Sequence, residues 1–180
     1  MEKFIEVHDD ILNPRLVDIV ENVVLVNANL PFNYNENLTF PRNHPSFSFK
    51  PGINHTFILY QQQKYPPFFF NNILYNFCVY KGIVIDKIIA GRVFIDFPTP
   101  SPKLDWPPHQ DLDSPHWVCL YYVNDSEGDT VFFDDSKKEI KRVSPKKGRI
   151  AFFDGTIYHA GTPSETNSRA VINFDFVPYL

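Results

Sequence analysis

The stretch WVCLYYVNDSEGDTVFF (residues 117–133) contains two short runs of β-branched and aromatic residues on either side of a polar segment. The runs WVCLYYV (117–123) and TVFF (130–133) are typical of β-strands, and the residues between them are typical of a turn. Similar runs recur before and after this stretch: RVFIDF (92–97), EIKRV (139–143), RIAFF (149–153), IYHAG (157–161) and RAVINFDFV (169–177). Their spacing of roughly ten residues predicts an all-β sandwich or barrel.

The first half of the chain has a different pattern. Residues 10–26 carry apolar side chains at helical spacing, and either Asp10 or Asn13 is the expected N-terminal cap. A second helix is expected over 66–82, with two prolines at its start and Gly82 just past its end. These two helices are predicted to pack on the β-structure that follows them.

The predicted fold class is mainly β (α+β), a β-barrel or jelly roll with N-terminal helices packed on one sheet. Residues 27–63 are rich in Asn, Pro and Gln and predict long loops with one or two short strands, for example Thr56–Tyr60. At 180 residues the chain fits one domain, 1–180. Within it, we expect 1–90 to give helical and loop support and 91–180 to form the catalytic barrel core.

Composition narrows the classes of partner and the compartment. The formal net charge of −4 gives no reason to expect nucleic acid or a membrane surface. No apolar run approaches the roughly 20 residues of a membrane-spanning helix, and the acidic, interrupted N-terminus is not a signal peptide. Cys78 and Cys119 each lie inside an apolar run, which predicts buried thiols in a reducing compartment. We therefore expect a soluble cytoplasmic chain; its oligomeric state stays open.

The motif His109-Gln110-Asp111 places an imidazole and a carboxylate two residues apart, so both lie on one face of an extended segment. The motif alone has little weight, because His8-Asp9-Asp10 has the same spacing. That first copy precedes the expected first helix, where carboxylates cap the helix and complement its dipole. We interpret the first copy as structural and the second as half of a metal site.

An Fe(II) site that activates oxygen needs two imidazoles and one carboxylate on one triangular face, with the other positions open. The third ligand must then return from a distant strand, and His159 in IYHAG is the candidate. The other histidines fit less well: His44 and His55 lie in the irregular first half, and His116 is too close in sequence to come from another strand. A buried structural histidine is the alternative for His159.

Alternation along the last predicted strand places Arg169, Val171, Asn173 and Asp175 on one face and four apolar residues on the other. The apolar face suits packing under the helices, which leaves Arg169 pointing into the barrel. An inward arginine needs an anionic partner. A dicarboxylate co-substrate is one such partner, since a guanidinium grips a carboxylate in a bidentate fork; an ion pair at the rim is the alternative.

In this order, His109-x-Asp111, His159 and Arg169 resemble the 2-oxoglutarate- and Fe(II)-dependent oxygenases, which fold as a double-stranded β-helix (jelly roll, cupin-like). The prolyl-4-hydroxylase-like branch, including its small phage-type members, is the most similar. LYYVND (120–125), EGDTVFF (127–133) and PKKGRIAFFDGTIYHAG (145–161) resemble that branch's motifs, and the resemblance covers about 92–177. It implies that Tyr122 helps to hold the distal carboxylate of 2-oxoglutarate.

Three positions depart from the branch's pattern. Asp129 stands where the branch often has a small residue or Glu, and Phe97 where some prolyl hydroxylases have a tyrosine that contacts the co-substrate. Val171 replaces a serine that other family members place two residues after the arginine. The co-substrate contacts beyond Arg169 and Tyr122 are therefore open.

The resemblance implies an Fe(II)- and 2-oxoglutarate-dependent dioxygenase that hydroxylates an organic substrate and releases succinate and CO₂. Fe(II), 2-oxoglutarate and O₂ are the implied cofactors, with ascorbate as a further candidate. His109, Asp111 and His159 are the implied metal ligands, and Arg169 joins them as an implied catalytic-site residue that binds the co-substrate. The substrate is a prolyl or other residue of a peptide or protein, or a small molecule.

Other functions remain as alternatives. A non-catalytic cupin-like metal- or ligand-binding barrel would have no need of the complete set of residues. A nucleobase oxidative demethylase tends to carry a second arginine six positions after the first, and here that position is Asp175. A Zn²⁺ hydrolase could use the same three ligands, but Arg169 would then be unexplained. The Asp111 carboxylate also argues against halogenation, which the family performs at sites without it.

Some features carry weaker functional hypotheses. The basic run KKEIKRVSPKKGR (137–149) predicts either a solvated hairpin or a docking surface for an acidic partner. Trp106 and Trp117 flank the metal motif and could line the substrate mouth, although core packing suits Trp117 at least as well. Asp113 is read as an exposed loop carboxylate, with a substrate contact as the alternative. The segment 27–65 could fold over the barrel as a lid.

Overall fold

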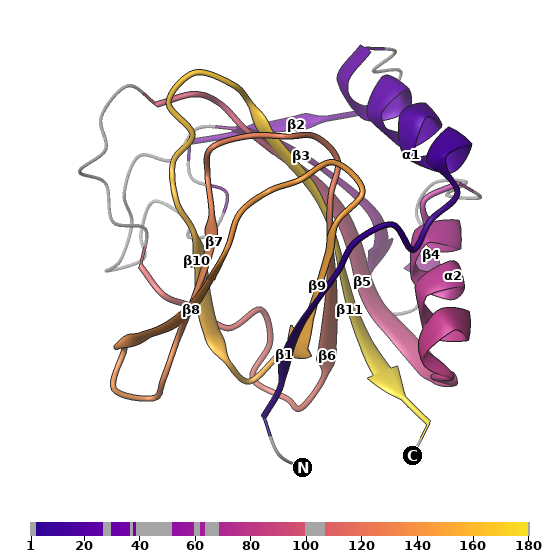
Figure 1. Ribbon diagram of the computed structural model, residues 1–180, viewed down its shortest axis with the longest axis vertical. Coiled ribbons are helices and arrows are strands. Elements are labelled where there is room, and N and C mark those ends of the chain that lie inside the picture. Colours follow the sequence, from indigo (N-terminus) through magenta and orange to yellow (C-terminus); the bar gives the residue numbers. More distant parts are fainter. Residues whose placement is uncertain are drawn as a thin grey trace.

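Two antiparallel sheets and two helices make up the computed structural model, which describes residues 3–26, 30–36, 38, 52–59, 62–63, 69–99 and 107–179. The larger sheet has the strand order β1-β9-β6-β11-β5-β3-β2, with β4 paired to β3, and the smaller sheet has the order β10-β7-β8. The small sheet, the large sheet and the helices follow one another as layers (Figure 1). This arrangement confirms the predicted mainly β jelly roll with N-terminal helices on one sheet.

The strands predicted in the second half of the chain are all present. Their bounds are β5 (Ile85–Asp96), β6 (Trp117–Tyr122), β7 (Thr130–Phe133), β8 (Glu139–Val143), β9 (Ile150–Asp154), β10 (Tyr158–Gly161) and β11 (Arg169–Pro178). The first half contributes β1 (Ile5–His8), β2 (Asn33–Asn35), β3 (Gly52–Leu59) and β4 (Gln62–Gln63). The segment expected at 92–97 is thus the end of a longer strand.

Both predicted helices form, with shorter bounds. Helix α1 (Pro14–Glu21) is capped by Asn13, whose side chain accepts a hydrogen bond from the backbone N–H of Arg15, and a π-helical turn η1 (Asn22–Val26) continues it. Asn13 is therefore the cap, and Asp10 is not. Helix α2 (Asn71–Lys81) ends at Gly82, which has a φ of 66° and so takes the left-handed conformation that glycine tolerates best. The two prolines expected at its start lie outside the described residues.

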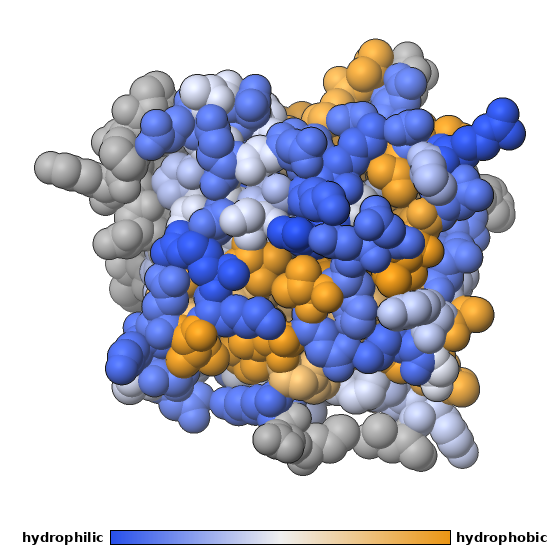
Figure 2. Space-filling view, in the orientation of Figure 1, coloured by the Kyte–Doolittle hydropathy of each residue, from blue (hydrophilic) through white to orange (hydrophobic). Residues whose placement is uncertain are grey.

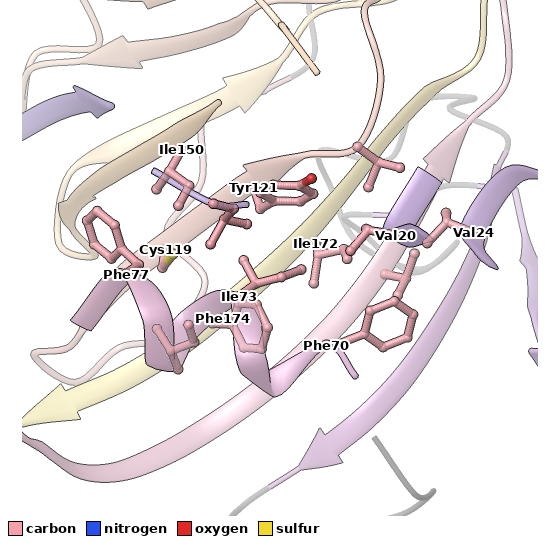
Figure 3. Packing of buried hydrophobic residues seen from close by; sticks show 14 of the residues in the cluster. Val20, Val24, Phe70, Ile73, Phe77, Cys119, Tyr121, Ile150, Ile172 and Phe174 are labelled. Carbon is pink, nitrogen blue, oxygen red and sulfur yellow. The ribbon is translucent and has the colours of Figure 1, made fainter. Parts of the chain in front are cut away.

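A hydrophobic layer joins the helices to the large sheet (Figure 3). Ile73 and Phe77 of α2 pack over Cys119 and Tyr121 of β6. Strand β11, which lies beside β6 in the sheet, contributes the side chains of its apolar face. That face is formed by Ala170, Ile172, Phe174 and Phe176. The predicted alternation along the last strand is therefore confirmed, and its other face points between the sheets.

The second hydrophobic layer lies between the two sheets. It contains Val118, Leu120 and Tyr122 from β6, Phe132 from β7 and Val171 from β11. Alternate side chains of one strand thus serve two different layers, as the two-residue period of a strand requires. The functional cavity opens within this second layer.

The first His-x-Asp copy is structural, but our interpretation of it as a helix cap is wrong. His8 is the last residue of β1, and its Nε2 lies 2.8 Å from a carboxylate oxygen of Glu6. Asp9 receives two hydrogen bonds from Arg149, from Nε at 2.8 Å and from an Nη at 2.9 Å. The carboxylate next to His8 therefore joins the end of β1 to Arg149, which directly precedes β9.

The basic run 137–149 is in part the exposed hairpin that one alternative predicted, and in part it pairs with the start of the chain. Four of its cations bond to residues between Ile5 and Glu21, as the pairs Lys141–Ile5, Lys146–Asp9, Lys147–Asp18, Lys147–Glu21 and Arg149–Asp9 show. On the face drawn in Figure 2, hydrophilic side chains gather where β1 passes the α1 end of the barrel. The carboxylates of Asp9, Asp18 and Glu21 thus pair with part of the run, while Lys137 and Lys138 stay exposed and docking of an acidic partner stays a prediction.

Several smaller predictions can also be compared with the structure. Cys78 and Cys119 are buried free thiols, as expected, and burial raises the pKa of Cys78 to about 12. The proposed lid 27–65 lies largely outside the described residues, but its parts 33–35 and 52–59 are strands of the large sheet. Among the described residues, no helix is long and apolar enough to cross a membrane.

Candidate metal centre and its cavity

The two candidate imidazoles are brought together by the backbone. His109 and His159 form an isolated antiparallel bridge, in which each backbone N–H donates to the other residue's carbonyl, at 3.0 and 2.9 Å. Their ring centroids lie 4.7 Å apart. Asp111 follows two residues after His109, and its carboxylate oxygens lie 3.9 Å from His109 Nε2 and 3.5 Å from His159 Nε2. One ligand atom from each of the three residues lies within 4.8 Å of the others.

Hydrogen bonds and charges fix the chemical state of this cluster. His159 is buried, and its Nδ1 lies 3.1 Å from the Ile157 carbonyl, an acceptor that requires a proton on that nitrogen. Nε2 of His159 is therefore the atom directed at Asp111. Burial raises the pKa of Asp111, but the hydrogen bond and the charge of His159 outweigh it and hold this pKa well below its usual range. The donor set is one carboxylate and imidazole nitrogens.

This donor set fits the metal that the sequence predicts. Two imidazoles and one carboxylate on one face are the ligands of non-haem Fe(II) oxygenases, and they leave the opposite coordination positions for other molecules. His109 and Asp111 are partly exposed and His159 is buried, so the cluster lies at the boundary between the core and an open cavity. The residues present therefore suit an Fe(II) ion.

The cluster opens into a cavity of about 190 Å³ between the two sheets. Its polar lining residues are Arg92, Asp96, His109, Gln110, Asp111, Thr130, His159, Arg169 and Asn173. Its apolar lining includes Phe94, Leu120, Phe153 and Val171. The metal candidates and Arg169 thus share one cavity, as the sequence analysis expected.

Arg169 is buried and held by three neighbours. Its Nε donates to the Gly128 carbonyl at 2.7 Å, one Nη to Asp96 at 3.1 Å and the other Nη to the hydroxyl of Thr130 at 2.8 Å. Glycine is required at 128, because a Cβ there would lie 2.9 Å from Cδ of Arg169 and 2.5 Å from the Thr162 carbonyl. The inward orientation predicted for Arg169 is present, and its anionic partner in this structure is Asp96.

Tyr122 is not among the described residues that line the cavity, but it contacts two residues that are. Its hydroxyl donates to Thr130 at 2.7 Å, and its ring lies 5.7 Å from the guanidinium carbon of Arg169. The side chain is fully buried, and burial raises its pKa, so the hydroxyl is a neutral donor. In this structure Tyr122 therefore acts on the cavity through two of its lining residues, Thr130 by a hydrogen bond and Arg169 by ring contact.

A buried polar network lies behind Asp111, and sequence reasoning assigned it no role. The side-chain amide of Asn173 donates to Asp111 at 3.2 Å and to Asp175 at 3.3 Å. Asp175 is fully buried, and Arg92 donates to it at 3.0 Å. Burial, and then the charge of Asp111, raises the pKa of Asp175 to about 8. Asn173 and Asp175 lie on the predicted inward face of the last strand, so alternation contained a signal for them.

Asp96 is the other cavity residue that the sequence analysis missed. The resemblance directed attention to Phe97, but among the described lining residues Asp96 is present and Phe97 is not. Asp96 lies opposite Arg169 in the register of β5 and β11. Alternation along RVFIDF would have placed Asp96 on one face with Arg92 and Phe94.

The remaining candidates lie away from the metal cluster or outside the description. Trp117 packs against Phe4 and Phe152 in the core, which confirms its structural interpretation. His55 is buried in β3, and Asp113 is an exposed loop residue as expected. His44 and Trp106 lie outside the described residues. His116 is buried, 3.8 Å from Asp175, and belongs to the network behind Asp111.

Comparison with known proteins supports the family resemblance. Residues 101–176 match the family model described as the 2OG-Fe(II) oxygenase superfamily. Among curated proteins, none matches this chain.

Solved structures share the fold over nearly the whole chain. A 2OG-Fe(II) oxygenase-family oxidoreductase from Burkholderia pseudomallei has a TM-score of 0.69 at 11% identity, covering 97% of this chain and 84% of that one. A Trichoplax adhaerens prolyl hydroxylase, solved with a peptide fragment of hypoxia inducible factor, has 0.65 at 13%, covering 96% and 83%. A collagen prolyl hydroxylase from Paramecium Bursaria Chlorella virus-1, in complex with 2OG, has 0.57 at 18%, covering 97% and 96%. Likeness at such identities establishes a common fold.

Proposed function

We propose that the chain, whose residues 101–176 match the family model of the 2OG-Fe(II) oxygenase superfamily, is an Fe(II)- and 2-oxoglutarate-dependent dioxygenase that hydroxylates an organic substrate. The observation that carries the proposal is the convergence of His109, Asp111 and His159 at a cavity that also contains Arg169. A binding barrel has no need of this combination. We propose the three convergent residues as the metal ligands and Arg169 as the anchor of the co-substrate.

The chain's own residues would position the reactants. The two imidazoles and the carboxylate would hold the metal on one face, and the His159–Ile157 hydrogen bond would keep the ring oriented. Arg169, supported by Thr130, would receive the distal carboxylate of 2-oxoglutarate. Bound iron would supply the coupled oxidation, in which O₂ converts 2-oxoglutarate to succinate and CO₂ and one oxygen atom enters the substrate.

The apolar part of the cavity would protect this chemistry from water. Phe94, Leu120, Phe153 and Val171 line the cavity together with the polar residues. Excluding water strengthens the electrostatic interactions inside a site and suppresses side reactions. The cavity walls would therefore favour transfer of oxygen to a bound substrate.

We propose a residue of a polypeptide, first of all proline, as the substrate. The motifs 120–125, 127–133 and 145–161 resemble those of the prolyl-hydroxylase-like branch. The Trichoplax adhaerens protein, which shares the fold, was solved with a peptide. These likenesses support the proposal by analogy of fold and motif.

Formation of succinate under air tests the dioxygenase proposal. The native chain should convert 2-oxoglutarate to succinate only when Fe(II) is added, with ascorbate included in parallel reactions. His109→Ala should abolish this conversion. His8→Ala makes the same substitution in the other His-x-Asp copy and should leave it intact. Metal binding without succinate from any reaction would instead favour a non-catalytic metal-binding barrel.

The substrate proposal needs its own experiment. A panel of proline-containing peptides, each matched with a copy in which alanine replaces proline, is incubated with the complete system and analysed by mass spectrometry. A single added oxygen atom on proline peptides alone would support the proposal. Succinate formation with no peptide oxidised, or equal oxidation of the alanine copies, would overturn prolyl hydroxylation and leave the dioxygenase assignment standing.

A further inference from the structure

The arginine proposed to bind the co-substrate already has a carboxylate beside it. Asp96 and Arg169 lie opposite each other in β5 and β11, and their side chains form an ion pair of 3.1 Å. The side chains of Arg169 and Asp96 are only 5% and 3% exposed, so water screens the pair very little. Both residues line the cavity. The positive charge of Arg169 therefore already faces a negative charge inside the cavity.

Arg169 is held in place by neighbours other than Asp96, so a carboxylate that binds to Arg169 would have to displace Asp96 or lie beside it. The Gly128 carbonyl and the Thr130 hydroxyl each accept a hydrogen bond from a guanidinium nitrogen of Arg169. Thr130 also accepts a hydrogen bond from the hydroxyl of Tyr122. The close approach of Gly128 to the arginine side chain leaves no room for retreat on that side. An incoming carboxylate would meet a neutralised cation and a carboxylate of like charge.

We propose that Asp96 is a specificity-determining residue, an internal counter-ion that weakens the binding of 2-oxo diacids at Arg169. The inference rests on the proposed function, because it concerns the same co-substrate site. Like charges placed together in a desolvated site oppose binding strongly. The distal carboxylate of 2-oxoglutarate should therefore add much less affinity here than an unopposed buried arginine would give.

Binding measurements on the unaltered chain test the inference first. Calorimetry on the Mn(II)-loaded protein compares 2-oxoglutarate with 2-oxopentanoate, which lacks the distal carboxylate. We expect 2-oxoglutarate to bind less than about tenfold more tightly, because Asp96 offsets the gain from Arg169. A preference of about a hundredfold or more would overturn the inference, since that is the effect of an unopposed charge pair.

Substitution of Asp96 gives the complementary test. In Asp96→Asn, which keeps the shape and an acceptor oxygen, the Kd for 2-oxoglutarate should fall by about tenfold or more. The Kd for 2-oxopentanoate should stay within about twofold. Asp86→Asn removes an exposed carboxylate from the same strand and should change neither value. Asp96→Ser is the second variant, and if neither Asp96 variant folds, the preference of the unaltered chain decides.

The outcomes separate this inference from the proposed function. Equal or weaker binding of 2-oxoglutarate by Asp96→Asn, or equal strengthening of both acids, would overturn the role of Asp96 alone. Failure of the unaltered Mn(II)-loaded chain and of Asp96→Asn to bind either acid would overturn the proposed function together with the inference.

Discussion

His109 and His159 exchange two backbone hydrogen bonds, although they come from segments far apart in the sequence. The bridge sets the two imidazoles side by side, and the extended segment after His109 brings Asp111 to the same place. The positions of the two histidines are thus set mainly by pairing of the main chain, and less by the rotamers of their side chains. A site built on paired strands is held more rigidly than one built on loops.

Asn173 is expected to position the carboxylate of Asp111. It donates to Asp111 and to Asp175, and so links the Asp111 carboxylate to the buried carboxyl group behind it. Asn173→Ala should lower the affinity for Co(II) by about 10- to 100-fold, the usual effect of removing an outer partner of a metal ligand. Calorimetric titration under nitrogen measures it.

The control for this experiment is Asn76→Ala, which removes an exposed amide of α2 far from the cavity. Both variants should show the same melting behaviour to within a few degrees, so that a change in affinity reports the site. Equal Co(II) affinities of Asn173→Ala and the unaltered chain would contradict the role of Asn173.

Tyr122 should act through Thr130. Tyr122→Phe removes the buried donor to Thr130, which also receives a hydrogen bond from Arg169. The free energy of unfolding should fall by about 0.5–1.5 kcal/mol, the worth of a buried hydrogen bond. The Kd for 2-oxoglutarate should rise severalfold as Thr130 loses its orientation. Denaturant unfolding and calorimetry measure the two effects; no change in either would show that the Tyr122–Thr130 contact is unimportant.

The ion pair between Asp9 and Arg149 should make stability depend on pH. The hydrogen bonds from Arg149 hold the pKa of Asp9 at about 2, below its ordinary value of 3.8. A lowered carboxyl pKa adds stability above the unfolded-state value, and this stability is lost as the pH falls toward 2. The Asp9 side chain is 34% exposed and that of Arg149 21%, so we expect no more than about 1 kcal/mol from the pair at neutral pH.

Comparison of Asp9→Asn with the unaltered chain checks this expectation. The variant should be less stable in urea at neutral pH, and the difference should disappear as the pH approaches about 2. Asp86→Asn, an exposed carboxylate of β5, serves as the control. A difference that stays constant from neutral pH down to about 2 would contradict the electrostatic origin of the effect.

Helix α2 should contribute stability through one face only. Phe77 is completely buried against the large sheet, whereas Val79 on the same helix is 82% exposed. Phe77→Ala should lower the free energy of unfolding by about 3–5 kcal/mol through lost burial and a residual cavity. Val79→Ala should change it by less than about 0.5 kcal/mol. Similar losses for both variants would mean that the helix does not depend on this face.

Local patterns explain which parts of the fold could be predicted. The strands of the second half and both helices have apolar spacing and turn residues within their own sequence. Strand β1 was missed, and β2 was expected only as an unplaced short strand within 27–63, because both are short edge strands whose partners, β9 and β3, are not local. The ends of the helices were expected too far out, since apolar spacing continues past α1 into η1.

The site could be predicted where alternation and family motifs agreed. His109, Asp111 and His159 meet as expected, and alternation correctly turned Arg169 inward. The sequence analysis did not identify Asp96 and Asn173 as residues of the site, because their roles depend on contacts between strands. Alternation can assign each to a face, but the bond of Asp96 to Arg169 depends on the register of two strands that are joined only in the fold.

The most direct test of the central claim is the visible absorption of the Fe(II)- and 2-oxoglutarate-loaded chain without oxygen. A weak charge-transfer band should appear only when metal and co-substrate are both present. It should be lost in His109→Ala and in His159→Ala, and it should persist in His8→Ala. Absence of the band from the unaltered chain, or its survival in both His109→Ala and His159→Ala, would contradict the claim that these residues hold the iron.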